Sequence, residues 1–211
     1  GSFANGTTGW STYSLPTAGD MTFNVIGGVA YFRRTGTQAV VLQNTGVGAA
    51  ANTLLTAQFK IGNTDTVRKR ISVLVHDNDF LDLHVCTFWL PANAPLRPFS
   101  MSTHTTKAWA NATISFYAAT AGSGGFYQLD DVALVTGAGS ADTTTCADPR
   151  TPAVAGGAAG PELVANGGFS AGLSPWTLFG QITGAVTGGV FEFVKNAGTP
   201  AGVVLQPTGQ A

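Results

Sequence analysis

The chain has 211 residues, of which only 10% are charged, and its formal net charge is −1. The near-neutral charge removes the electrostatic basis for binding nucleic acid, and no apolar run approaches the roughly 20 residues that a membrane-spanning helix needs. The 28 glycines and 10 prolines favour short strands joined by turns over long helices.

Strand signals begin near the N-terminus. Residues 21–34 predict a hairpin that turns at Gly27-Gly28, because glycine supplies the positive φ of a tight hairpin turn. Further strands are expected over 39–46, 54–63, 68–79, 83–91, 112–120 and 125–135. No segment keeps a helical period for three turns. About nine short strands separated by turn signals predict an all-β sandwich.

The opening sequence of the chain returns near its end. At an offset of 166 residues (169 − 3), the matching pairs are Phe3 and Phe169, Gly6 and Gly172, and Trp10 and Trp176. The likeness resumes between residues 27–46 and 188–209, which share G-G-V and V-V-L-Q-x-T-G. This self-similarity predicts one full module followed by the opening part of a second.

Between the two copies lies a small, polar stretch rich in proline and glycine. Residues 136–161 show no hydrophobic period, which is typical of a linker. We therefore expect a sandwich module over 1–136, a linker over 137–160, and the N-terminal part of a homologous module over 161–211.

The two edges of the first module resemble a known family. The start Gly1-Ser2-Phe3 with Trp10, and the last strand "FYQLDDVALV" over 126–135, are similar to family-4/9-type carbohydrate-binding modules. This resemblance implies a jelly-roll sandwich of the galactose-binding-like type. It also implies a module attached to a glycan-active enzyme or repeated in a large surface protein.

The resemblance also implies a structural calcium, and here the chain departs from the family. The family carries Glu after the motif Phe, whereas this chain has Ala4 and Ser170 in those places. Calcium prefers several oxygen ligands, usually including carboxylates. We expect Asp130 or Asp131, near the Phe3 end of the fold, to hold whatever calcium remains.

Sugar binding usually needs exposed aromatic side chains with polar groups beside them. The candidates in this chain are Trp89, Trp109, Tyr31, Tyr117, Arg33 and Gln128. Each aromatic has an alternative role in the core, because large aromatics dominate protein cores. Phe88 and Trp89 are adjacent in a strand and must face opposite sides, so one of them is expected to be exposed.

A catalytic set is absent from the sequence. A glycosidase needs two facing carboxylates, but Asp130 and Asp131 are neighbours in a strand and point to opposite faces. The only glutamates are Glu162 and Glu192, and neither G-x-S-x-G nor H-E-x-x-H occurs. The polar run over 76–84 is interpreted as a turn whose Asp side chains cap backbone groups. A non-catalytic protein is expected.

The two cysteines bear on both fold and location. We predict that Cys86 and Cys146 form a disulfide that ties the linker to the sandwich. Disulfides persist in oxidising compartments, and the low charge is common in secreted and surface β proteins. An extracellular or cell-surface protein is therefore expected.

Two functions remain open. The first is a structural or adhesive tandem-repeat component, built head-to-tail with other copies of itself by strand or half-module complementation. Its expected assembly segment is the strand-like lead-in Glu162, Leu163, Val164, Ala165 and Asn166. The alternative is a carbohydrate-binding module that takes a polysaccharide. An aromatic strip on one sandwich face would favour the alternative, and aromatics buried between copies would favour the first.

Overall fold

The computed structural model describes residues 1–211 except 16–19, 123, 140–142, 149–161, 197–201 and 209–211. The chain divides into two compact units, Gly1–Pro152 and Ala153–Ala211. The described secondary structure is almost entirely strand, with one short 3-10 helix, η1, at Phe3–Asn5. No helix among the described residues is long and apolar enough to cross a membrane.

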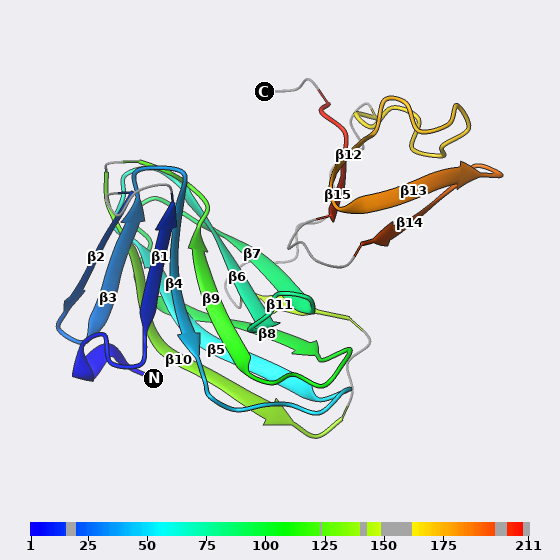
Figure 1. The fold of residues 1–211 in the computed structure, drawn as a ribbon. Coiled ribbons are helices and arrows are strands. Elements are labelled where there is room, and N and C mark those ends of the chain that lie inside the picture. The colour runs from blue at the N-terminus through cyan, green and yellow to red at the C-terminus, as the bar shows by residue number, and fades with distance from the viewer. Residues whose placement is uncertain (16–19, 123, 140–142, 149–161, 197–201, 209–211) are drawn as a thin grey trace. The chain divides into compact units, whose positions relative to one another are not determined.

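Two antiparallel sheets form the first unit (Figure 1). The five-stranded sheet contains, in spatial order, β1 (Ser11–Leu15), β4 (Gln38–Asn44), β9 (Ala112–Ala118), β6 (Lys69–Asp77) and β7 (Leu83–Leu90). The six-stranded sheet contains β11 (Thr145–Ala147), β8 (Arg97–His104), β5 (Leu54–Asn63), β10 (Tyr127–Gly137), β3 (Val29–Arg34) and β2 (Met21–Ile26). This confirms the predicted jelly-roll β-sandwich.

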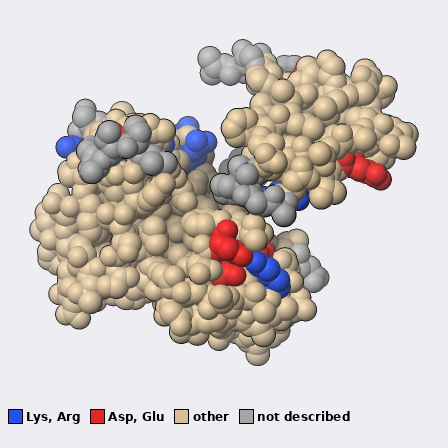
Figure 2. Space-filling model, viewed as in Figure 1, with Lys and Arg blue, Asp and Glu red and all other residues tan. Residues whose placement is uncertain are grey.

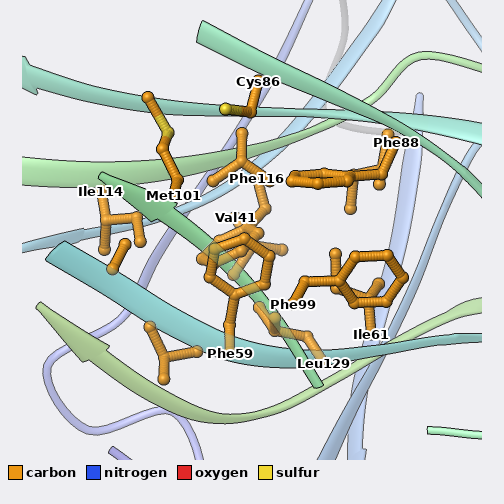
Figure 3. Packing of buried hydrophobic residues seen from close by; sticks show 14 of the residues in the cluster. Val41, Phe59, Ile61, Cys86, Phe88, Phe99, Met101, Ile114, Phe116 and Leu129 are labelled. Atoms are coloured by element: carbon orange, nitrogen blue, oxygen red, sulfur yellow. The ribbon is translucent and has the colours of Figure 1, made fainter. Parts of the chain in front are cut away.

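The core lies between these two sheets. Alternating residues of each strand point inward, as the period of two in a strand requires. On β6 the buried apolar side chains are Ile71, Val73 and Val75, which occupy every second position of the strand. Phe59 of β5 packs against aromatic rings from both sheets, including Phe99 and Phe116, with ring centroids 6.3 Å and 5.3 Å away (Figure 3).

Local turn chemistry explains the hairpin at β2 and β3. Gly27 and Gly28 have φ of 59° and 80°, values that side chains with a Cβ rarely adopt. The hairpin over 21–34 was predicted from this Gly-Gly pair. The strands β1, β8 and β11 were not expected, because their sequences are polar or short and lack a strong apolar alternation.

The predicted disulfide is confirmed. Cys86 of β7 and Cys146 of β11 are bonded, with a sequence separation of 60 residues. β7 and β11 are the last strands of the two sheets, so the bond joins the sheets along one edge of the sandwich. The linker prediction for 137–160 is wrong at 145–147, because Thr145–Ala147 pairs with β8. Residues 140–142 and 149–160 of that prediction lie outside the described residues.

The second unit repeats the pairings of the first four strands. β12 (Thr177–Gly180) pairs with β15 (Gly202–Leu205), and β13 (Ile182–Thr187) pairs with β14 (Val190–Lys195). Phe179 lies opposite Val203 as Tyr13 lies opposite Val40. All four β12–β15 pairs match β1–β4 pairs, and all six β13–β14 pairs match the six β2–β3 pairs.

The lead-in to the second unit differs from the prediction. Glu162–Asn166 was expected to be strand-like, but these residues are irregular and then enter a turn. Asn166 has φ of 50°, and its side-chain amide donates to the carbonyl oxygens of Gly172 and Ser174 at 2.8 Å each. The backbone of Ala165 is held by the Gln206 side chain. This segment therefore closes a loop within its own unit.

Candidate functional site

The outer side of the five-stranded sheet carries a continuous row of side chains. On β9, Ile114 and Phe116 point into the core, so Thr113, Ser115 and Tyr117 point outward. Strand pairing places the outward residues side by side across all five strands. The row through Tyr117 is Tyr13, Val40, Tyr117, Ser72 and Thr87.

Three aromatic side chains lie on this outer side, and we call Tyr13, Tyr117 and Trp89 the aromatic strip. Tyr13 and Trp89 are each 48% exposed, and Tyr117 is half-buried. Tyr13 and Tyr117 lie two strands apart, which corresponds to about 10 Å between their backbones. Trp89 follows Thr87 at the next outward position of β7, so the strip crosses the sheet obliquely.

The strip is uncharged, and hydroxyl groups accompany it. Burial raises the pKa of Tyr117, and the neighbouring Tyr13 adds to the rise, so the Tyr117 phenol stays protonated. The hydroxyl oxygens of Ser72 and Thr87 lie 3.0 Å apart at the surface. Donors and acceptors beside aromatic rings are the combination that orients a sugar.

Two arginines flank Trp89. The guanidinium of Arg68 lies 4.0 Å from the ring centroid and that of Arg70 lies 5.6 Å away. Lys69, between them, points inward and is 1% exposed. Its Nζ lies 2.9 Å from Oδ2 of Asp65. Arg68 and Arg70 therefore lie against the exposed Trp89 ring, and Lys69 forms a buried ion pair with Asp65.

Buried polar groups support the face beside the strip. Ser115 and His76 are fully buried although they lie on the outer side of the sheet. His76 Nε2 and Ser115 Oγ lie 2.8 Å apart, and the His76 ring stacks on Phe80 at 4.0 Å. Burial lowers the pKa of His76. The predicted turn over 76–84 therefore packs against one end of this outer side, through the contact between Phe80 and His76.

Three other predicted sugar-binding residues gather on the opposite side of the sandwich. Tyr31 and Arg33 of β3 and Gln128 of β10 are half-buried on the outer side of the six-stranded sheet. Gln128 Nε2 donates to the Tyr31 hydroxyl at 3.1 Å. The Arg33 guanidinium lies 4.7 Å from the centroid of Phe126. Tyr31 and Gln128 already bind each other, whereas Tyr13 and Trp89 of the strip are each 48% exposed.

Trp109 is a correction. It is 3% exposed and belongs to the core, and its Nε1 donates to Oδ2 of Asp82 at 2.6 Å. A ring buried in this way cannot stack on a sugar. Its polar end explains the placement, because a buried indole N–H requires an acceptor and the 76–84 turn supplies one.

The two predicted calcium ligands are in different environments. Asp131 lies 2.7 Å from Lys60 Nζ, and its φ of 49° marks the bulge in β10. Asp130 has a buried Oδ1 with no hydrogen-bond partner, which is unusual for a carboxylate and suits a cation ligand. The described residues contain no group of three or more His, Cys, Asp or Glu placed to hold a metal. Asp130 fits calcium only together with backbone oxygens.

Sequence reasoning missed Tyr13, which begins the strip. The stretch Ser11–Leu15 is mostly small and polar around Tyr13, so it gives only a weak apolar signal for a strand. Its role depends on the pairing of β1 with β4. The only sequence signal for this residue was a single Tyr placed three residues after Trp10 in a short polar stretch.

Sequence comparison finds no match: no protein-family model fits the chain, and no curated protein is similar to it. Solved structures are similar in fold. One, described as "CBM4 structure and function", is 21% identical and covers 64% of this chain and 91% of its own, with a TM-score of 0.49. A carbohydrate-binding module of family 29 is 12% identical, covers 61% and 82%, and has a TM-score of 0.44.

An arabinose-bound α-L-arabinofuranosidase, MgGH51, is 12% identical with a TM-score of 0.50. The match covers 64% of this chain but only 24% of that enzyme's chain. Likeness at such low identity speaks to the fold alone. The first unit has a jelly-roll β-sandwich fold.

Proposed function

We propose that the first unit is a non-catalytic carbohydrate-binding module that takes a neutral polysaccharide across the outer side of its five-stranded sheet. The observation that carries this proposal is the aromatic strip. Tyr13 and Trp89 are exposed, and they lie with Tyr117 on one side of one sheet.

The chemistry of the strip suits sugar rings. The C–H groups of a sugar ring pack on an aromatic face, because that face carries the negative part of the ring quadrupole. Hydroxyls of Ser72 and Thr87 can exchange hydrogen bonds with the hydroxyls of a sugar. The two arginines at the Trp89 end add donors without placing a charge among the tyrosines.

The surroundings fit a neutral ligand outside the cell. Figure 2 shows a surface that is largely free of charged side chains on the side it displays, in keeping with the 10% charged composition. Acidic polysaccharides would call for a broad basic patch. The disulfide is compatible with an oxidising, extracellular compartment.

The test is binding to polysaccharides with single aromatic variants. The whole chain is screened by affinity electrophoresis in gels containing β-glucan, xylan or mannan, and the best ligand is taken to titration calorimetry. Removing one central aromatic contact costs about 2 kcal/mol in many interfaces, which is about 30-fold in Kd. We expect losses of that order for Tyr13→Ala and Tyr117→Ala.

The matched control is Tyr31→Ala, which removes a tyrosine from the opposite side of the sandwich. It should leave the affinity within about twofold, because Tyr31 lies across the core from the strip. If Tyr31→Ala weakens binding and Tyr13→Ala does not, the ligand binds the six-stranded sheet and the strip is refuted as the site. Absence of binding to every polysaccharide argues for the second candidate.

The second candidate is a structural tandem-repeat component assembled head-to-tail. The observation that favours it is the second unit, whose strands repeat those of the first while many of its apolar side chains, including Phe193 and Val194, are exposed. Sedimentation velocity over a wide concentration range tests it. Growing polymers would support head-to-tail assembly, and a single small species at every concentration would contradict it.

A further inference from the structure

Two arginines at the Trp89 end of the aromatic strip have no carboxylate partner among the described residues. Arg68 precedes β6 and Arg70 lies within it, and both are exposed. No ion pair joins either of them to an aspartate or glutamate in the described part of the chain. Other cations of the first unit do have such partners, namely Lys60, Lys69, Arg97 and Lys107. The two arginines therefore carry charges that no described carboxylate neutralises.

The Trp89 ring contacts both guanidinium groups. Strand pairing puts Arg70 directly opposite Trp89 on the outer side of the five-stranded sheet. The Arg68 guanidinium lies over the ring, 4.0 Å from its centroid, and that of Arg70 lies 5.6 Å away. A guanidinium that stacks on an aromatic face does so with its flat side, and its N–H donors lie in its plane. Contact with the ring therefore consumes none of those donors.

The backbone of Arg70 is fixed by three hydrogen bonds. Its N–H donates to Thr120 Oγ1 at 2.8 Å. Its carbonyl oxygen accepts from the Tyr127 hydroxyl at 2.7 Å and from the Ala119 N–H at 3.1 Å. A site whose backbone is already ordered loses less entropy when a ligand binds. This end of the strip is thus a preorganised, positively charged surface.

The two charges lie beside the tyrosines of the strip and not among them. The row of outward residues through Tyr117 contains no lysine or arginine. Arg70 and Trp89 lie two residues further along their strands than Ser72 and Thr87 of that row, which corresponds to about 7 Å. A ligand that covers both regions therefore meets a neutral surface and, to one side of it, a doubly charged one.

We propose that the Trp89 end of the strip is a subsite for a carboxylate, carried by a uronic acid branch of an otherwise neutral polysaccharide. The neutral main chain lies across the tyrosines, and the carboxylate accepts hydrogen bonds from Arg68 and Arg70. The planar guanidinium fork matches the two oxygens of a carboxylate. A polymer charged at every unit is a poor match, because the row through Tyr117 offers it no cation. The subsite belongs to the polysaccharide site proposed above and depends on it.

The experiment compares one polysaccharide in two charge states. Glucuronoxylan is used as extracted and after chemical reduction of its carboxylates to hydroxyls, which leaves the same chain uncharged. The whole 211-residue chain is titrated with each form by calorimetry at low salt. We expect the native form to bind about tenfold more tightly, because charge-assisted hydrogen bonds are about twice as strong as neutral ones. Sodium chloride at about 0.5 M should remove most of that preference, since it screens exposed charges.

Single charge removals test the arginines. Arg68→Gln and Arg70→Gln should each reduce the preference for the native form to about threefold, and the double variant should abolish it. All three should bind the reduced form within about twofold of the intact chain. The matched control is Lys107→Gln, which removes one positive charge at the other end of β6, where Lys107 Nζ lies 3.8 Å from Asp77 Oδ2. It should keep the preference, because Asp77 and Arg70 are about 23 Å apart along the strand.

Tyr13→Ala separates the subsite from the site that it extends. This variant should weaken binding of both forms and keep the preference for the native one. Equal affinity of the intact chain for the two forms overturns the carboxylate subsite, and the neutral site then stands or falls with the effect of Tyr13→Ala. A sulfated xylan that binds as tightly as glucuronoxylan also overturns it, because the subsite would then recognise charge alone. Binding to neither form overturns it too, whereas binding of another neutral polysaccharide in the screen above would leave the proposed function intact.

Discussion

Removal of the Cys86–Cys146 bond should cost the first unit a large part of its stability. The perturbation is the double substitution Cys86→Ala and Cys146→Ala. The bond closes a loop of 60 residues between the two sheets, and a loop of that length is worth about 4 kcal/mol in the chain-entropy account. Cys86 is 1% exposed, so the lost sulfur leaves a small cavity that adds about 1 kcal/mol. β11 is exposed along its length and contributes little by itself.

The assay is urea unfolding followed by tryptophan fluorescence, in which the buried Trp109 reports on the first unit. We expect the free energy of unfolding to fall by about 4–5 kcal/mol in the double variant. Thr145→Ala is the control, because it changes an exposed residue of β11 and keeps the bond. A loss below about 1 kcal/mol would refute the reasoning that the bond acts by closing the long loop.

Two further predictions concern protons and calcium. Burial lowers the pKa of His76 and of His84, so the unfolded chain binds more protons than the folded chain once the pH falls below about 6.5. The stability that these histidines contribute should be fully present above that pH and should be lost progressively as the pH falls below it, and His76→Gln should flatten the decline measured by urea unfolding. For calcium, we propose Asp130 as the carboxylate ligand: calcium should raise the melting temperature, Asp130→Asn should abolish the rise, and Asp131→Asn should retain it. Identical melting in chelator and in excess calcium would show that the first unit has no calcium site.

Local chemistry made several features predictable. Gly27 and Gly28 predicted the hairpin because a tight turn needs positive φ at both positions, and the structure has it. The opposite orientations of Phe88 and Trp89 followed from the strand period, and their exposures of 5% and 48% confirm it. The disulfide was predictable because the chain has only two cysteines.

The candidate site was harder to predict because it depends on pairing between remote strands. Tyr13, Tyr117 and Trp89 lie on β1, β9 and β7, and they share one side only because β4 and β6 lie between those strands. No local sequence pattern shows that Tyr117 lies on the outer side of the sheet while Trp109 lies in the core. Trp109 is buried because Asp82, from a distant turn, accepts its N–H.

The strands β1–β4 have two roles. They close the core through Phe32 and Val41 and also supply Tyr13, the first ring of the aromatic strip. In the second unit the place of Tyr13 is taken by Phe179, which is 64% exposed and pairs with Val203. Tyr13→Phe makes the same exchange in the first unit, because it keeps the ring and removes the phenol hydroxyl. Loss of one hydroxyl removes a hydrogen bond worth about 1 kcal/mol, so the variant should bind the polysaccharide about fivefold more weakly. A calorimetric titration that shows no change in Kd would mean that Tyr13 contributes through its ring alone.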